Sequence, residues 1–140
     1  MEEERMKFTI YLPENPTVTS QEKGYNKFTG QFYTKEEVKA LKTTYYYEIR
    51  RAMTLNKLTN PMYKGAVRLK VTFTFASNIK KYWGLYKVSK PDCDNAVKAL
   101  QDVLGDLGFF ETGDQQVVDL HVIKFWGDRP KIEIEIEEVG

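Results

Sequence analysis

Hydrophobic and polar residues alternate along three segments of the chain, residues 6–12, 67–75 and 131–137, and we expect a fourth strand over residues 115–125. A period of two is typical of a strand that buries one face. The pattern is clearest in residues 67–75, where every second residue is hydrophobic and the others are basic or threonine. In the last segment we expect the isoleucines to face the core and the solvent-facing side chains to be Glu133, Glu135 and Glu137.

Two other segments have hydrophobic residues at helical spacing, which predicts helices over residues 35–55 and 95–107. Thr34 and Glu37 fit a capping box at the start of the first helix, and Gly108 is placed to end the second. The expected buried stripes are Val38, Leu41, Tyr45, Ile49 and Ala52 in the first helix, and Val97, Leu100, Leu104 and Leu107 in the second.

The elements follow the order strand, helix, strand, helix, strand, strand. This order predicts an α+β fold in which a mixed four-stranded sheet packs against two main helices. With 140 residues and no linker composition, the chain is expected to form a single domain, residues 1–140. The polar segment at residues 17–32 is expected to be an exposed loop or an irregular hairpin.

Composition narrows the class of protein. No apolar run approaches the roughly 20 residues of a membrane span, and the acidic N-terminus lacks an apolar signal core, so we predict a cytoplasmic protein. The single cysteine, Cys93, excludes an internal disulfide and a cysteine-based zinc cluster.

Charge is unevenly distributed, although the net charge is only +1. Residues 49–91 contain no acidic residue, and a block of one sign favours a polyanionic partner such as DNA. The alternative is a solvated surface spread over several faces. The ten basic residues of this segment are Arg50, Arg51, Lys57, Lys64, Arg68, Lys70, Lys80, Lys81, Lys87 and Lys90.

The predicted loop at residues 78–90 combines basic residues with Tyr82, Trp83 and Tyr86. Such rings can stack on exposed bases. Packing into the core is an equally good interpretation from sequence alone.

Carboxylates gather around the start of the second helix. Asp92 and Asp94 flank one residue, Lys98 follows Asp94 at helical spacing, and Asp114 comes from a later loop. Oxygen ligands without a histidine or cysteine cluster point to Mg²⁺ or Mn²⁺, which can polarise a phosphodiester and acidify a bound water. The pattern therefore indicates a metal-dependent phosphodiesterase.

Each of these residues also has a purely structural interpretation. Asp94 can cap the helix, and Asp114 can form a turn beside Gly113. Lys98 and Asp102 can be solvated helix residues. His121, the only histidine, is better explained as a partnered structural residue than as a catalytic one.

The motif resembles that of the RusA family of Holliday junction resolvases, Asp-x-Asp-Asn-x-x-Lys-x-x-x-Asp followed by an aspartate near a Gln/Val run. Here it occupies residues 92–102, and Asp114-Gln115-Gln116-Val117-Val118 follows. The resemblance implies that Asp92, Asp94 and Asp114 bind the metal, and that Lys98 is an essential catalytic lysine beside them. Gly113 departs from the family, in which many members carry a second aspartate at this position.

The resemblance implies a homodimeric, Mg²⁺-dependent endodeoxyribonuclease that resolves four-way DNA junctions by paired symmetrical nicks during recombination and repair. Mn²⁺ is a possible substitute, and the source is a bacterium or its phage or prophage. Two alternatives remain: a less selective nuclease of branched DNA, and a catalytically silent DNA-binding module. The expected phosphate contacts are Arg68, Lys70, Lys80, Lys81, Lys87 and Lys90.

Overall fold

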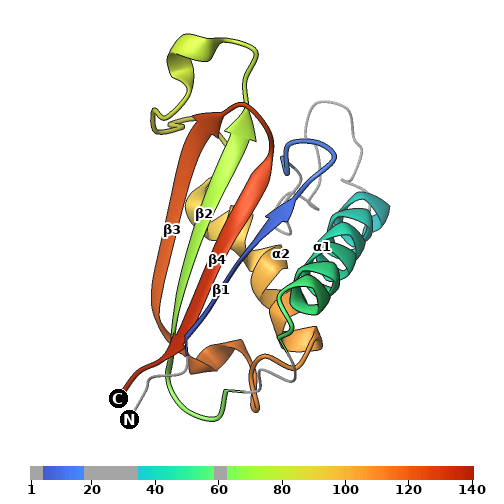
Figure 1. The fold of residues 1–140 in the computed structure, drawn as a ribbon, viewed down its shortest axis with the longest axis vertical. Coiled ribbons are helices and arrows are strands. Elements are labelled where there is room, and N and C mark those ends of the chain that lie inside the picture. Colours follow the sequence, from blue (N-terminus) through green and yellow to red (C-terminus); the bar gives the residue numbers. More distant parts are fainter. Residues whose placement is uncertain (1–4, 18–34, 59–62) are drawn as a thin grey trace.

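Four strands form one mixed sheet in the computed structural model, which describes residues 5–17, 35–58 and 63–140 (Figure 1). The strands are β1 (Arg5–Tyr11), β2 (Val67–Ala76), β3 (Val117–Gly127) and β4 (Lys131–Glu138). They lie in the order β1-β4-β2-β3, with β4 antiparallel to both neighbours and β2 parallel to β3. The four predicted strands are confirmed.

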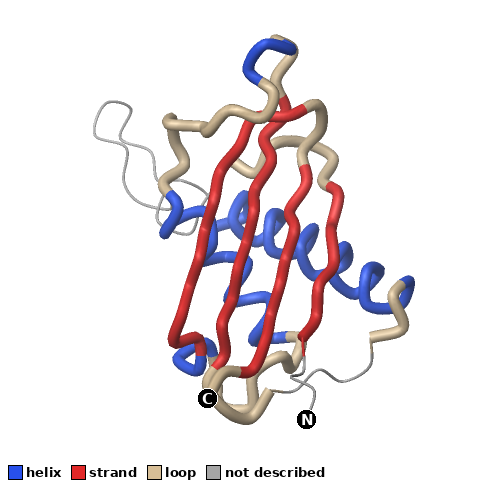
Figure 2. The backbone as a smooth tube through the Cα atoms, turned by 60° about the vertical axis from the view of Figure 1, so that its left-hand side comes forward, coloured by secondary structure: helices blue, strands red, loops and turns tan. Residues whose placement is uncertain are grey.

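Two main helices, α1 (Lys35–Leu55) and α2 (Cys93–Asp106), cover the same face of the sheet (Figure 2). The element order confirms the predicted α+β architecture; short 3₁₀ helices at Lys80–Tyr82 and Asp114–Gln116 are additions to it. Thr34 of the predicted capping box and most of the predicted loop at residues 17–32 lie outside the described residues. In the part that is described, no helix is long and apolar enough to cross a membrane.

The core lies between the sheet and the helices. The predicted hydrophobic positions of β2 and the isoleucines of β4 are fully buried, as are Tyr45 and Ile49 of α1 and Leu100 and Leu104 of α2. Full burial of one such side chain is worth about 1.5–3 kcal/mol, so these stripes fix how each element faces the sheet. Leu41 and Leu107 are only partly buried at the edge of this core.

β3 and β4 are consecutive in the sequence but do not pair, because β2 lies between them. β2 and β3 are parallel, and such a pair needs a long crossover connection, which α2 provides here. As a result, β3 is an edge strand and α2 runs across the back of the sheet (Figure 1).

Gly108 ends α2, as predicted from sequence. Its φ of 84° is in the left-handed region, its N–H donates to Gly105 O at 3.0 Å, and Phe109 N–H donates to Leu104 O at 3.1 Å. This pair of bonds is a Schellman motif. It turns the chain so that Phe109 is buried and the following loop carries Asp114 toward β3.

Candidate active site

Asp92 and Asp94 lie at the N-terminus of α2. The helix begins at Cys93, so Asp92 is the N-cap residue and Asp94 is in the first turn. Ala96 N–H donates to the main-chain oxygen of Asp92 at 2.8 Å, but the Asp92 carboxylate makes no capping bond. The prediction that Asp94 could be the N-cap is therefore wrong.

Both carboxylates are exposed. Within the described part of the chain, neither has a hydrogen-bond or ion-pair partner. The positive end of the helix dipole lies beside them. Their oxygens are thus available to a ligand.

Two lysines hold the backbone that leads into Asp92. Lys124 Nζ donates to Ser89 O at 2.8 Å and to Pro91 O at 2.6 Å. Lys87 Nζ donates to Ser89 O at 3.1 Å, to Ser89 Oγ at 2.8 Å and to the main-chain oxygen of Lys90. Charge-assisted bonds of this kind are about twice as strong as neutral ones. We refer to Lys87 and Lys124 as the lysine clamp.

Lys87 is only 7% exposed, which was not expected of a predicted phosphate contact. Its Nζ lies 4.9 Å from the ring centres of both Phe75 and Trp126. Burial, and then the charge of Lys124, lower the pKa of Lys87 from its ordinary value. The clamp was missed in the sequence, although Lys124 interrupts the core-facing positions of β3 between Val122 and Trp126.

The other motif residues of α2 lie along the helix. Lys98 is exposed one turn after Asp94. Asp102 is paired with Lys42 of α1 at 2.9 Å, so it links the two helices rather than standing free in solvent. Cys93 donates through Sγ to Val122 O at 3.5 Å, which places the start of α2 beside the middle of β3.

Asp114 starts the 3₁₀ helix before β3 and is exposed. It borders a hollow that is also lined by Gln101, Asp102, Gly105 and Asp106 of α2. Asp114 therefore lies beside the C-terminal half of α2, whereas Asp92 and Asp94 lie at its N-terminus.

Buried Gln116 holds the loop of Asp114 in place. Its Nε2 donates to Tyr63 O at 2.8 Å and to Gly65 O at 2.9 Å. Its Oε1 accepts from Thr112 N–H at 2.6 Å and from Thr112 Oγ1 at 2.9 Å. The position of Gln116 directly after Asp114 and Gln115 was visible in the motif, but a buried role is not evident from sequence.

A single chain does not bring the three predicted metal ligands together. Asp94 and Asp102 are eight residues apart on α2, which is about 12 Å along the axis, and Asp114 lines the same hollow as Asp102. Among the described residues, no three acidic, histidine or cysteine side chains are grouped to hold a metal ion. Asp92 and Asp94 alone fit Mg²⁺, which keeps several waters and uses one or two carboxylates with substrate phosphates.

The basic residues of the acid-free segment are distributed over α1, β2, the loop before α2 and the connection between α1 and β2, which carries Lys57 and Lys64. Lys80, Lys81 and Lys90 are exposed on that loop, and Lys70 is exposed on β2. Arg68 is paired on the uncovered face of the sheet, its Nε with Asp119 and a terminal nitrogen with Glu137, each at 2.7 Å.

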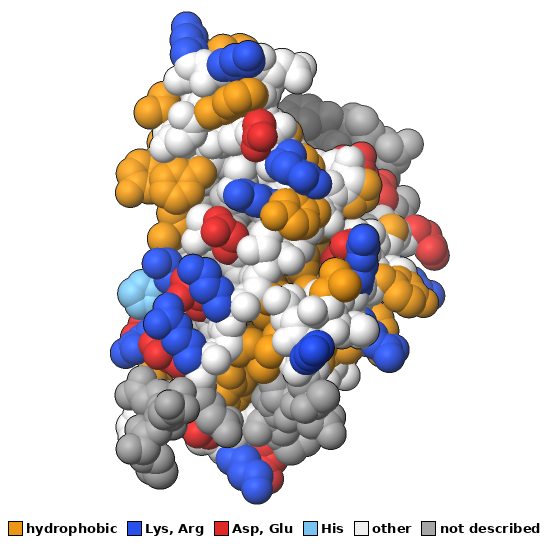
Figure 3. All heavy atoms as spheres, viewed as in Figure 1, with side chains coloured by type: hydrophobic (Ala, Val, Ile, Leu, Met, Phe, Trp, Pro, Cys, Tyr) orange, Lys and Arg blue, Asp and Glu red, His pale blue; other side chains and the backbone are white. Residues whose placement is uncertain are grey.

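Asp119 contacts both Arg68 and the histidine on this uncovered face. The hydrogen bond from Arg68 is the main reason that the pKa of Asp119 lies below its usual value. His121 Nε2 lies 2.9 Å from an oxygen of Asp119, which confirms the prediction of a partnered histidine. In Figure 3, basic and acidic side chains are intermixed on this part of the surface. The face is therefore not uniformly basic.

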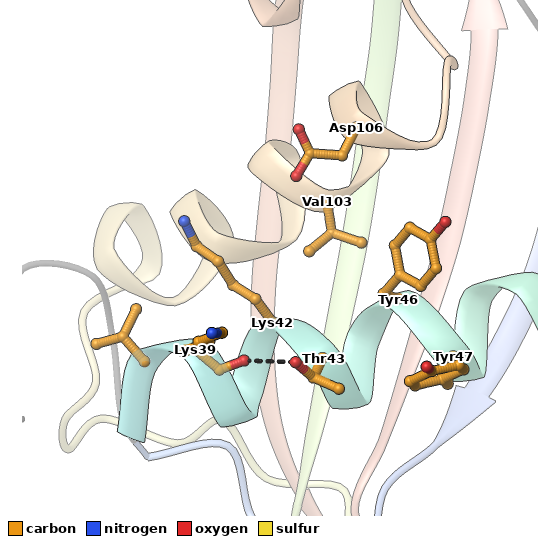
Figure 4. Close-up of a pocket in the computed structure, with 8 residues that line it drawn as sticks. Lys39, Lys42, Thr43, Tyr46, Tyr47, Val103 and Asp106 are labelled. Carbon is orange, nitrogen blue, oxygen red and sulfur yellow. Dashed lines mark hydrogen bonds between the residues drawn. The ribbon is translucent and has the colours of Figure 1, made fainter. Parts of the chain in front are cut away.

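A pocket of about 540 Å³ lies between α1 and α2 (Figure 4). α1 contributes Lys39, Lys42, Tyr46 and Tyr47, and α2 contributes Val103 and Asp106. None of the motif carboxylates lines it. We do not assign the active site to this pocket, because Asp92, Asp94 and Asp114 lie elsewhere.

Comparison with known proteins agrees with the motif. Residues 13–137 match the family described as Endodeoxyribonuclease RusA. The crossover junction endodeoxyribonuclease rusA of Lactococcus phage r1t is 36% identical over 138 residues, which cover 96% of this chain and 99% of the phage protein. The uncharacterized protein YqaN of Bacillus subtilis (strain 168) is 46% identical over 56 residues, which cover 40% of this chain and 38% of YqaN.

The family match over residues 13–137 and the near full-length phage relative show that the chain belongs to the RusA family of endodeoxyribonucleases.

Proposed function

We propose that residues 1–140 form one RusA-like nuclease domain that cuts four-way DNA junctions with paired symmetrical nicks. The observation that carries this proposal is the pair Asp92 and Asp94: two exposed carboxylates that have no partner among the described residues, on a backbone held by the lysine clamp. The near full-length relative from a phage, which is named for crossover junctions, supports the same substrate. We propose that this chain acts on recombining DNA in the bacterial cytoplasm, as a protein of the host or of a phage.

Asp92 and Asp94 would hold Mg²⁺, with Mn²⁺ as a substitute, and Asp114 would complete the ligand set. The ion would polarise the scissile phosphate and acidify the attacking water. Lys98 shares a helix face with Asp94 and would stabilise charge on the phosphate oxygens. The helix N-terminus would add its own attraction for the phosphate.

The distance between Asp114 and the other two acids supports a homodimer. If Asp114 serves the same ion, it must come from a second chain, because α2 separates it from Asp92 and Asp94 within one chain. A two-fold dimer would then contain two identical sites, each built from both chains. Two such sites match the two opposed strands of a junction.

Mixing two inactive variants tests this arrangement. Asp92→Asn and Asp114→Asn homodimers should each bind a labelled junction and fail to nick it in Mg²⁺. In a mixed dimer with shared sites, one site carries both substitutions and the other carries none. Nicking of one strand should therefore return after the two variants are denatured and refolded together.

The matched control mixes Asp92→Asn with Asp94→Asn, which lie on the same chain segment. Both sites of that mixed dimer carry a substitution under either arrangement, so activity should stay absent. If the first mixture is also inactive while its dimers exchange chains, each site lies within one chain and Asp114 is not a shared ligand.

Cleavage of a junction, a flap and a plain duplex separates this function from its alternatives. Metal-dependent paired nicks confined to the junction establish a resolvase. Similar cutting of the flap indicates a less selective nuclease of branched DNA. Salt-sensitive binding without any cutting indicates a silent DNA-binding module.

A further inference from the structure

The segment between β2 and α2, Ser77–Lys90, projects beyond the end of the sheet (Figure 1). We call it the aromatic loop. The prediction that its rings could pack into the core is wrong, because they lie at the surface. Basic and hydrophobic side chains lie together at this end of the molecule (Figure 3). The exposed hydrophobic residues of the loop are Ile79, Tyr82, Trp83, Leu85, Tyr86 and Val88.

Tyr86 is the most exposed ring of the loop, at 69%. It stacks on Phe125 of β3 with ring centres 4.9 Å apart and planes 18° from parallel. The pair is a flat, preformed aromatic surface, and a third ring could extend its stack.

The backbone on either side of Tyr86 is fixed to the edge of the sheet. Gly84 N–H donates to Trp126 O at 2.8 Å, Trp126 N–H donates to Leu85 O at 2.9 Å, and Lys87 N–H donates to Lys124 O at 2.9 Å. A ring held in this way needs little further ordering when it binds.

The charges of the loop favour an anionic, aromatic ligand. The loop has no acidic residue. Lys80 Nζ lies 5.9 Å from the ring centre of Trp83, and Lys81 Nζ lies 5.4 Å from that of Tyr82. Aromatic rings beside cations are the combination that proteins use to bind unpaired bases along a phosphate backbone.

The loop also lies near the proposed active site. Tyr86 is paired with Phe125, and Cys93 contacts Val122, three residues away on the same strand. At about 3.3 Å per residue this is on the order of 10 Å along β3. Three nucleotides at about 3.4 Å each span a similar length, so one strand can reach both places.

We propose that Tyr86, assisted by Trp83 and Tyr82, stacks on a base that is unstacked at the branch point, and that this contact makes the protein prefer junctions to duplexes. The inference rests on the proposed function and adds the residues that recognise the branch. A regular duplex has no free base face at this position and gains nothing from the ring.

Binding of a junction and of a duplex with the same arm sequence, at one salt concentration in EDTA, tests the proposal without cleavage. Tyr86→Ala should weaken junction binding by roughly 5- to 150-fold, the equivalent of one base–aromatic stack, and leave duplex binding unchanged. Tyr86→Phe keeps the ring and should bind the junction like the wild type.

Tyr47→Ala is the matched control, because Tyr47 is 65% exposed but lies on α1, away from the loop. It should change neither affinity. Equal loss on junction and duplex for Tyr86→Ala, or no loss on either, would overturn the proposal. An unchanged thermal midpoint excludes unfolding as the cause of any loss.

Nicking of the junction by the wild type in Mg²⁺, measured on the same preparation, tests the proposed function separately from the role of Tyr86. If the wild type nicks junctions, and Tyr86→Ala prefers junction over duplex as strongly as the wild type does, only this inference fails. If the wild type neither prefers nor nicks junctions, the proposed function and the inference both fail.

Discussion

Single lysines in this chain have different roles because their surroundings differ. Lys80 and Lys81 are exposed beside aromatic rings, whereas Lys87 is buried and bonded to main-chain oxygens. All three belong to the same acid-free segment. The carboxylates differ in the same way: Asp102 is paired with Lys42, and Asp92 has no partner among the residues that the structure describes.

The buried lysine should give stability a measurable dependence on pH. Because the pKa of Lys87 is lower in the folded chain than its ordinary 10.5, the unfolded chain binds more protons between the two values. The free energy of unfolding of the wild type should therefore increase as the pH rises between these two pKa values. Lys87→Met should remove this gain, as measured by urea unfolding at several alkaline pH values.

Lys90→Met is the control, since Lys90 is exposed on the same loop. It should keep the pH dependence of the wild type. An unchanged pH dependence in Lys87→Met would mean that the ammonium of Lys87 is as well solvated in the folded chain as in the unfolded chain.

We also expect Lys87→Met to lower nicking, because only one of the two ammonium groups of the lysine clamp before Asp92 remains.

At the level of elements, α2 separates the proposed metal ligands into two groups. Its N-terminus presents Asp92 and Asp94, and its C-terminus, ended by Gly108, leads to the loop of Asp114. Gln116 connects that loop to Tyr63 and Gly65, in the segment before β2, through hydrogen bonds to their main-chain oxygens. Together with main-chain bonds such as that from Glu111 N–H to Tyr63 O at 3.0 Å, this side chain sets the position of the loop.

We expect Gln116→Leu to lower the free energy of unfolding by about 1–3 kcal/mol, the cost of leaving a buried polar group without its partner. Its neighbour provides a control of the same residue type: Gln115 is exposed. Gln115→Leu should change stability by less than about 0.5 kcal/mol. Urea unfolding of both variants measures the difference, and equal values would show that the bonds of Gln116 are replaced by water at no cost.

For the whole molecule, the position of the cations matters more than the net charge of +1. The aromatic loop brings Lys80, Lys81 and Lys90 to one end of the sheet, close to Asp92 in the chain. Arg68 on the uncovered face is neutralised by two acids. We therefore propose that DNA approaches the end of the sheet that carries the loop.

The salt dependence of junction binding tests that approach. Replacing Lys80 and Lys81 by alanine should reduce the slope of log K against log salt by up to about 0.9 for each phosphate that the variant no longer neutralises. The control replaces Lys39 of α1 and Lys64, which precedes β2 at the far end of the sheet, and so removes the same charge. Equal slopes for the two double variants would place the DNA elsewhere.

The local pattern of the sequence was enough to predict the four strands, the two helices, their buried stripes and the acidic motif. Periods of two and of three to four report which face of an element is buried, and this depends on neighbouring residues alone. The arrangement of elements was not predictable in this way. The insertion of β2 between β3 and β4 depends on which strands pair over long distances, and no short segment encodes that.

The same limit applies to the site. Spacing in the sequence placed Asp92 and Asp94 at the start of α2 and Lys98 one turn further along, because a helix converts spacing directly into position. Asp114 is only twelve residues beyond Asp102, yet the direction of α2 decides that it lies at the opposite end from Asp92. Only the packed structure decided which lysines are buried and which acids remain free, because burial depends on contacts between elements that are far apart in the chain.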